Sequence, residues 1–276
     1  MRFTISAVTT VVAAVILAVL AGCGGALAAP NPSDQPAPPA KPTVVLVHGA
    51  FADSSSWNGV VERLQRDGYP VLAVANPLRG LQQDARYVAS VLDSVPGPVV
   101  LAGHSYGGSV ISEAAVGAAN VKALVYVASF ILEPGESTSA LAGKFPGGQL
   151  GPALRSVPVT PATGGEDTDL YIQQDQFAKV FAADVAPEVA ASMAATQRPI
   201  TTSALDEPAT RAAWHDIASW NLVTTEDLAI PADSMRFMGK RATSTTVEVA
   251  ASHAVTVSRP DVVADLVDQA ARATAS

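Results

Sequence analysis

The sequence predicts an α/β fold, built on a doubly wound, mostly parallel sheet of six strands with a cap insertion after the fourth strand. Short apolar, β-branched runs alternate along the chain with segments of helical periodicity. The predicted strands are apolar at nearly every position, as in parallel sheets that helices cover on both faces. The alternation stops between about residues 132 and 220, and an insertion of that size usually forms a lid over a site.

Six segments have the length and the continuous apolar character of buried parallel strands. In chain order they are Thr43–Val47, Val71–Ala75, Val99–Ala102, Val121–Ala128, Asn221–Thr224 and Thr245–Ala250.

The predicted helices lie between these strands. In the first, residues 54–68, serines stand at the start, Trp57, Val60 and Leu64 recur at helical spacing, and a glycine ends the segment. The others are predicted at residues 81–92, 105–119, 233–241 and 260–273.

The composition indicates one substantial hydrophobic core. Of the 276 residues, 49% are hydrophobic and 15% are charged, which favours a folded domain over residues 43–276 and argues against disorder. The formal net charge is −8, and the chain has no lysine- or arginine-rich run. A nucleic-acid partner requires a clustered basic surface, so we expect none.

Residues 1–22 have the anatomy of an export signal. Arg2 is the only charged residue before Asp34, and the stretch Ala7–Leu20 is apolar apart from two threonines. The sequence Leu20-Ala21-Gly22-Cys23 follows and resembles the bacterial lipobox, whose cysteine is lipidated and becomes the N-terminus. Cys23 is the only cysteine, so the chain cannot form an internal disulfide. We expect export to the bacterial cell envelope, with a lipid on Cys23 as the only link to a membrane.

Two other outcomes remain open for this segment. Cleavage after Ala28 or Ala29 would give a soluble secreted protein, and an uncleaved signal would be a membrane anchor. The apolar stretch is shorter than the ~20 residues that span a bilayer. Residues 23–42 are predicted to be a spacer, since six of the 13 residues from Pro30 to Pro42 are proline. Such a segment favours extended polyproline II chain and forms no core.

The sequence Gly103-His104-Ser105-Tyr106-Gly107 fits the pattern Gly-x-Ser-x-Gly at the point where a predicted strand passes directly into a predicted helix. In that context the pattern predicts a nucleophile elbow, a tight turn that presents the serine hydroxyl above the carboxyl edge of the sheet. Ser105 is therefore the candidate nucleophile. The alternative is a glycine-rich turn that only packs.

A serine nucleophile needs a base, and the chain has four histidines. His48 ends the first strand, His104 adjoins the serine, and His215 lies in the insertion, where a structural role is expected. His253 follows the last strand at the edge where doubly wound sheets place their sites. It also lies C-terminal to the serine, as the chain order Ser, acid, His requires, so His253 is the candidate base.

The acid should lie between the serine and the histidine, after a strand. Asp227 is the preferred candidate, because its loop after the fifth strand would turn the carboxylate toward the histidine. The rivals are its neighbour Glu226 and, after the fourth strand, Glu133. The acid would fix the imidazole tautomer and stabilise the imidazolium.

Two backbone N–H groups should stabilise the developing oxyanion. We expect them at Tyr106, directly after the nucleophile, and at Ala50, in the loop after the first strand. The ring of Phe51 is expected to line the substrate pocket. The histidines have no metal-site spacing and no second cysteine accompanies Cys23, so we predict neither a metal nor another cofactor.

These motifs, in this order, resemble the branch of α/β-hydrolases that contains plant methylesterases, hydroxynitrile lyases and bacterial small-ester hydrolases. The resemblance runs from about Thr43 to the C-terminus. It rests on residues 47–50 with Trp57, residues 103–108, residues 225–231 and Ser252-His253. The lyases carry a threonine and a lysine where this chain has Gly49 and Ala254, which makes cyanohydrin cleavage improbable.

The resemblance and the candidate residues together predict an esterase that cleaves carboxylic esters of small or medium apolar compounds through an acyl-enzyme. Two alternatives remain: a non-catalytic binding lipoprotein on the same fold, and an acyl transferase that uses the same triad. Apolar residues of the insertion should either roof the pocket or hold the insertion on the sheet. They are Phe145, Leu150, Leu154, Phe177, Phe181, Met193 and Trp214.

Overall fold

The computed structural model describes residues 41–161 and 164–275, all of them within the unit Ala40–Ser276. The predicted signal at residues 1–22, the lipidation site Cys23 and the predicted spacer up to residue 40 lie outside the described residues. Export, lipidation and the domain boundary at residue 43 therefore stay predictions.

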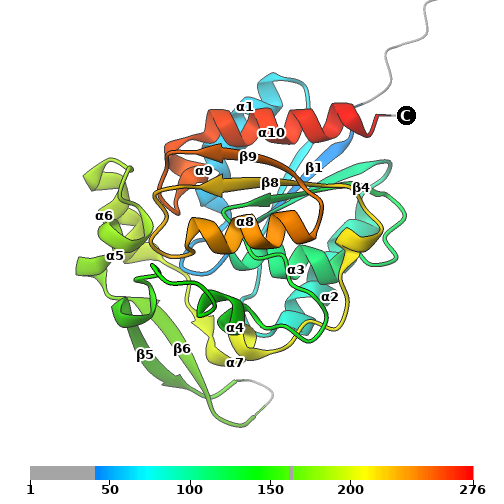
Figure 1. The fold of residues 1–276 in the computed structure, drawn as a ribbon. Helices are drawn as coiled ribbons and strands as arrows, with labels where there is room; N and C mark the ends of the chain where they lie inside the picture. Colours follow the sequence, from blue (N-terminus) through cyan, green and yellow to red (C-terminus); the bar gives the residue numbers. More distant parts are fainter. Residues whose placement is uncertain (1–40, 162–163, 276) are drawn as a thin grey trace, which may run out of the picture. The chain divides into compact units, whose positions relative to one another are not determined.

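A six-stranded parallel sheet with the order β2-β1-β3-β4-β8-β9 forms the centre of the fold (Figure 1). This confirms the predicted fold class. Every pair of neighbouring strands in this sheet is parallel. The strands are β1 Thr43–Val47, β2 Val71–Val74, β3 Val99–His104, β4 Val121–Val127, β8 Ser219–Thr224 and β9 Thr245–Val249.

The strand order reverses direction at β1. After β1 the chain forms β2 on one side of it and then β3 on the other side. The connections that leave β1 and β3 therefore run in opposite directions. Val47 pairs with Gly103 in the register of β1 and β3, so the segments that follow them begin side by side. Doubly wound sheets bind ligands at such a switch point, outside the carboxyl ends of the strands.

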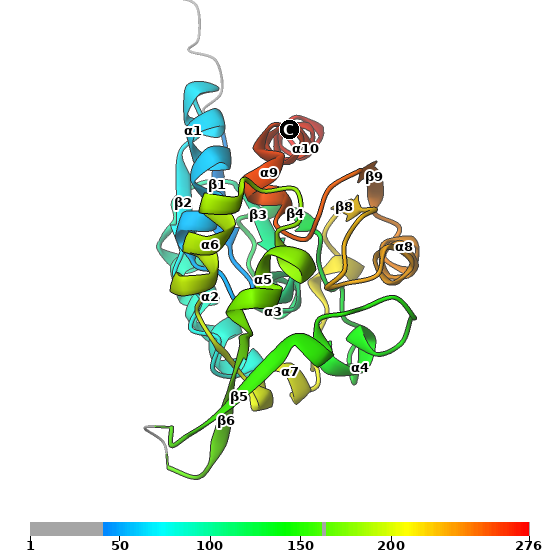
Figure 2. The same ribbon diagram turned by 90° about the vertical axis from the view of Figure 1, so that its left-hand side faces the viewer.

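Helices cover both faces of the sheet (Figures 1 and 2). One face carries α1 and α10, and the other carries α2, α3 and α8. Their bounds are α1 Asn58–Arg66, α2 Leu81–Ser94, α3 Tyr106–Ala114, α8 Ala232–Arg241 and α10 Pro260–Ala273. A 3-10 turn, η2 Ser54–Trp57, precedes α1, and the short α9 Val255–Ser258 precedes α10.

The helix after Ser105 is shorter than predicted. The sequence favours helix over residues 105–119, whereas α3 ends at Ala114. Gly117 has a φ of +82°, and the N–H of Val116 bonds to the carbonyl of Glu113, three residues back. The chain must turn there to enter β4, and this requirement overrides the helix propensity of its alanines.

The insertion after β4 forms a cap of short elements. A three-stranded antiparallel sheet has the order β5-β6-β7, and its β5–β6 hairpin lies apart from the large sheet in both views. The strands are β5 Leu154–Val159, β6 Asp167–Ile172 and β7 Ile200–Thr201. The helices are α4 Thr138–Ala142, α5 Gln174–Phe181, α6 Pro187–Thr196 and α7 Thr202–Asp206, with 3-10 turns η3 Gly151–Ala153 and η4 Ala213–His215.

Polar side chains of the sheet domain hold the cap. Arg79 pairs with Asp169 on β6 and donates a second hydrogen bond to a cap carbonyl. Glu113 on α3 is buried, and its carboxylate accepts hydrogen bonds from the backbone of Thr210 and Arg211. The cap is therefore fastened at both its outgoing strands and its returning segment.

Candidate active site

Ser105 occupies the turn between β3, which ends at His104, and α3, which begins at Tyr106. Its backbone has φ 56° and ψ −126°, a conformation that residues with a side chain rarely adopt. Such strain persists only where neighbouring structure holds it. The Ser105 carbonyl accepts hydrogen bonds from the N–H groups of Gly108 (3.0 Å) and Phe130 (3.3 Å) and from the hydroxyl of Ser129 (2.6 Å).

The turn also depends on a close approach to β1. A Cβ atom on Gly107 would lie 2.4 Å from the carbonyl oxygen of Val47, far inside contact distance. Only glycine fits there, which is the physical reason for the second glycine of the Gly-x-Ser-x-Gly pattern. The packing brings the start of α3, with its positive dipole end, beneath the loop that leaves β1.

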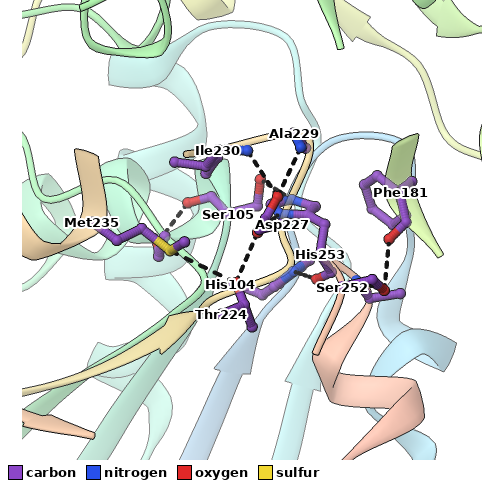
Figure 3. A network of polar contacts seen from close by, with 12 residues as sticks. His104, Ser105, Phe181, Thr224, Asp227, Ala229, Ile230, Met235, Ser252 and His253 are labelled. Carbon is purple, nitrogen blue, oxygen red and sulfur yellow. Dashed lines mark hydrogen bonds and ion pairs between the residues drawn. The ribbon is translucent and has the colours of Figure 1, made fainter. Parts of the chain in front are cut away.

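The side chains of Ser105, Asp227 and His253 lie close together (Figure 3), and His253 bonds to both of the others. Its Nδ1 is 2.7 Å from Asp227 Oδ2, and its Nε2 is 2.9 Å from Ser105 Oγ. The Asp227 carboxylate can only accept a hydrogen bond, so Nδ1 of His253 carries the proton. Nε2 is then unprotonated and can accept a hydrogen bond from the serine hydroxyl. All three side chains are buried. The sequence places these residues on three separate loops, and the sheet brings them into one hydrogen-bonded line.

Four hydrogen bonds fix the carboxylate of Asp227. Oδ1 accepts the N–H groups of Ala229 and Ile230, each at 2.8 Å. Oδ2 accepts the hydroxyl of Thr224 at 2.8 Å as well as His253 Nδ1–H. With both oxygens occupied, the carboxylate has one orientation, and that orientation sets the plane of the imidazole.

The rival acids and His215 of the cap lie away from Ser105 and His253. Glu226 is exposed, and the structure does not bring its carboxylate to His253. Glu133 pairs with His215 at 3.0 Å, and the His215 ring stacks on Trp214 with centroids 3.9 Å apart. The pair holds the returning end of the cap, so His215 has the structural placement expected from the sequence.

The β1 loop, residues 48–53, carries the second predicted oxyanion donor. Neither the N–H of Ala50 nor that of Tyr106 donates to an acceptor among the described residues, whereas the next N–H, that of Phe51, bonds to the Arg198 carbonyl at 2.9 Å. Ala50 and Tyr106 line the same cavity as Ser105. Free N–H groups beside a nucleophile can receive the negative charge of a tetrahedral intermediate.

His48 braces this loop. Its Nδ1 lies 2.9 Å from the Gly49 carbonyl, and its Nε2 accepts the backbone N–H of Asn76 at 3.0 Å. The Asn76 side chain donates to the His48 carbonyl at 3.0 Å. Burial lowers the pKa of His48 to about 4, so its ring is neutral at neutral pH and holds the loop in place.

A cavity of about 450 Å³ opens above Ser105 and His253. This volume lies within the usual range for small-molecule sites. Its walls are mostly apolar, and none of the described residues that line it is lysine or arginine. From the sheet domain come Ala50, Phe51, Tyr106, Phe130, Ala229 and Ile230, and from the cap come Thr138, Ser139, Ala142, Leu150, Leu154, Leu170, Thr202, Leu205 and Asp206, with several glycines and Pro152.

The cap residues that the sequence could not sort fall into two sets. Leu150 and Leu154 line the cavity. The others pack elsewhere: Phe177 and Phe181 are buried in α5, Phe145 packs at a tilt against Phe237, Met193 lines a smaller cavity of about 240 Å³, and Trp214 donates to the Leu132 carbonyl. Phe51 contacts both the large cavity and the ring of Phe181, with centroids 6.4 Å apart.

Sequence reasoning missed two polar partners of the site. Thr224 is the last residue of β8, and its hydroxyl bonds to Asp227, three residues later. This spacing was visible in the sequence around Asp227. Asp84 on α2 is fully buried and accepts the hydroxyl of Tyr106 at 2.9 Å. Burial raises the pKa of Asp84 to about 6. A lone aspartate at a helical position gave no signal of this contact.

Within residues 41–161 and 164–275 there is no group of three or more metal-ligating side chains. Over the same residues, no helix combines the length and the apolarity needed to cross a membrane.

Residues 44–266 match the alpha/beta hydrolase family. Among curated proteins, the chain is similar to the alpha/beta hydrolase nvfD of Aspergillus novofumigatus, with 29% identity over 254 residues. The match covers 84% of this chain and 97% of the relative.

Solved structures with the same fold include three enzymes. A pyrethroid hydrolase from Sphingobium faniae JZ-2 is 22% identical with a TM-score of 0.69, covering 85% of this chain and 98% of that one. Polyneuridine aldehyde esterase is 17% identical with a TM-score of 0.71, covering 83% and 98%. Tomato methylketone synthase I, complexed with 2-tridecanone, is 19% identical with a TM-score of 0.66, covering 85% and 99%. At these identities the likeness extends to the fold.

Proposed function

The chain belongs to the alpha/beta hydrolase family, as the sequence motifs indicated, and from this we propose that it is a serine esterase acting on carboxylic esters of small or medium, uncharged apolar compounds. The observation that carries the proposal is the hydrogen-bonded line from Asp227 through His253 to Ser105 at the floor of an apolar cavity. Two of its structural neighbours are named as an esterase and a pyrethroid hydrolase, which supports the same reaction class.

In the proposed reaction, Ser105 Oγ attacks the ester carbonyl while His253 Nε2 takes the hydroxyl proton. The N–H groups of Ala50 and Tyr106 stabilise the oxyanion. Collapse of the tetrahedral intermediate breaks the C–O bond, and His253 gives its proton to the leaving alcohol. A water molecule, activated by His253, then attacks the acyl-enzyme, releases the carboxylic acid and restores Ser105.

The cavity supports an uncharged substrate. Among the described residues that line the cavity, the only carboxylate side chain is that of Asp206, at the exposed end of α7. A substrate with a free carboxylate would meet this negative charge and no positive one. Apolar walls favour alkyl or aryl groups through burial, at about 0.8 kcal/mol for each methylene group.

The proposal is tested with a fluorophosphonate probe and short p-nitrophenyl esters on the full chain. The probe should label Ser105 in mass spectrometry, and Ser105→Ala should lose labelling and up to ~10⁶ in kcat while staying folded. Ser90→Ala, an exposed serine on α2, is the matched control and should behave as the wild-type chain. Residual activity of a tenth in Ser105→Ala would refute the nucleophile. Binding of esters without turnover would instead indicate a receptor, and transfer to an added alcohol in preference to water would indicate an acyl transferase.

We also propose that the enzyme is exported and that Cys23, if lipidated, anchors it. This rests on the sequence of residues 1–42 alone.

A further inference from the structure

His104 is a buried histidine for which the proposed mechanism has no use. It is the last residue of β3, directly before Ser105, and it is 1% exposed. Its Nε2 lies 2.9 Å from the backbone carbonyl of His253. Because a carbonyl only accepts, Nε2 carries the proton and donates it. Nδ1 is buried without a hydrogen-bond partner among the described residues. The one polar contact of this side chain is therefore with the backbone of the proposed base.

The histidine loop, residues 251–254, contains no regular structure and is held by hydrogen bonds with His104, Phe181, Asp184 and Glu226. His104 bonds to the carbonyl of His253. The Phe181 carbonyl, at the end of cap helix α5, accepts the N–H of Ala254 at 2.8 Å and the hydroxyl of Ser252 at 3.3 Å. The N–H of Glu226 bonds to the carbonyl of Ala251 at 3.2 Å. Ser252 also bonds to Asp184 through its hydroxyl. Of these attachments, that of His104 is to the backbone of the proposed base itself.

Two aromatic rings also pack against the imidazole of His253. The rings of His104 and Phe181 each have their centroid 4.8 Å from that of His253. They are perpendicular to one another at 6.3 Å, so they contact the imidazole from different directions. The side chain of His253 therefore cannot rotate toward either ring without displacing it, and its remaining side borders the cavity.

We propose that His104 is a positioning residue, which holds His253 so that Nε2 points at Ser105 Oγ, together with Phe181 on the cap side of the ring. The proposal rests on the proposed function, because it presupposes that His253 is the base. The hydrogen bond from His104 ties the His253 carbonyl to β3, the strand that ends directly before Ser105. It therefore fixes the distance between the proposed base and the proposed nucleophile.

The charge state of His104 suits this role. Burial lowers the pKa of His104 well below the ordinary value, and the nearby charge of protonated His253 lowers it further. His104 thus stays neutral when His253 carries the serine proton, and it adds no repulsion to the imidazolium.

The test compares His104→Gln with His104→Asn in the full chain. The glutamine amide nitrogen is as many bonds from the backbone as histidine Nε2 and can donate to the His253 carbonyl, whereas the asparagine amide is one bond shorter. We expect the Gln variant to retain most of kcat and the Asn variant to lose about ten- to a hundredfold, with KM nearly unchanged. The rate of fluorophosphonate labelling of Ser105 should follow kcat, falling in the Asn variant and changing little in the Gln variant.

A second measurement separates positioning from stability. The low-field proton resonance of the His253–Asp227 hydrogen bond should persist in His104→Gln and weaken in His104→Asn and Phe181→Leu. Val100→Ala, a buried substitution on the same strand, should lower Tm and leave both the resonance and kcat per labelled site unchanged.

Equal kcat values and equal resonances in the Gln and Asn variants would overturn the inference. If either histidine variant does not fold, Phe181→Leu decides, and a wild-type resonance and kcat in that variant would also overturn it. The proposed function fails separately, if Ser105 of the wild-type chain is neither labelled nor active.

Discussion

Asp227 shows how one residue is selected from three carboxylates. It lies three residues after Thr224 and two before Ala229, and both of these donate to it. Glu226 has its side chain on the solvent side of the same loop. Loop geometry, and not the identity of the charge, therefore decides which carboxylate meets His253.

Asp227→Asn should lower kcat by about 10⁴, because an amide would favour the wrong tautomer of the imidazole. Glu226→Gln and Glu133→Gln are the matched controls, and each should change kcat far less. Steady-state kinetics on one p-nitrophenyl ester is sufficient. A larger loss in either control than in Asp227→Asn would show that a different carboxylate supports the base.

Gly49 also acts at the scale of one residue. A Cβ there would lie 2.6 Å from Ser105 Cβ and 2.7 Å from the His104 carbonyl oxygen. The threonine that the hydroxynitrile lyases carry at this position would require the β1 loop or Ser105 to shift. The absence of a side chain at Gly49 thus allows Ser105 to lie where it does.

The sequence predicted Ser105, His253 and Asp227 because motif order and strand ends are local signals, and the structure places the three together. It gave no role to His104 beyond its position beside the serine. The contact of His104 with His253 joins residues 149 positions apart and depends on the register of the sheet. Such contacts carry no periodicity that a single sequence reveals.

At the scale of elements, the strands were predicted because β1, β3, β4 and β8 are buried over nearly their whole length, and the half-exposed edge strands β2 and β9 are rich in valine and threonine. The cap elements were not. Strands β5 and β6 are half exposed and pair only with one another and with β7, and α4 and α7 have five residues each. Elements this short are stabilised by tertiary contacts more than by propensity.

The cap should set the length of the acyl or alcohol group. Leu154→Trp would fill part of the cavity, so the ratio of kcat/KM for p-nitrophenyl octanoate to that for p-nitrophenyl acetate should fall by about tenfold if two methylene groups are excluded. Phe145→Leu, in the cap but outside the cavity lining, should leave the ratio unchanged. An unchanged ratio in the Leu154 variant would mean that the chain of the ester lies elsewhere.

For the whole molecule, buried Asp84 gives stability a distinctive dependence on pH. Its pKa is raised from 3.8 to about 6 by burial, so between these values the folded chain binds a proton that the unfolded chain releases. This contribution therefore increases the free energy of unfolding as pH falls. His48, whose pKa is lowered to about 4, acts in the opposite direction.

Asp84→Asn removes only the first of these contributions. At each pH, the free energy of unfolding of the variant is compared with that of the wild-type chain by urea unfolding. The loss in the variant should be about 2 kcal/mol larger at pH 4.5 than at pH 7.5. Since His48 is present in both chains, its contribution cancels. A stability difference independent of pH would show that Asp84 titrates normally.

At the scale of the whole chain, we expect residues 1–23 to determine its location. If Cys23 is lipidated, intact mass and N-terminal analysis of protein from the native host should show an acylated chain that begins at Cys23 and sediments with membranes. Cys23→Ser should release it or halt its processing without changing kcat. An unmodified N-terminus at Ala29 or Pro30 would refute lipidation and leave the proposed enzyme activity untouched.

Separate stretches of the cap line the cavity and hold the histidine loop. The cavity is lined by residues from 138–154, by Leu170 and by residues of α7, whereas the histidine loop is fastened to the end of α5 at Phe181 and Asp184. Substitutions that reshape the cavity thus need not disturb the base. For protein engineering, residues 138–154 and 202–206 are the segments to exchange with those of relatives to change substrate preference, whereas Asp169, which pairs with Arg79, and residues 177–184 are to be kept. Because of this separation, the lining of the cavity can vary while Ser105, Asp227 and His253 keep their hydrogen bonds.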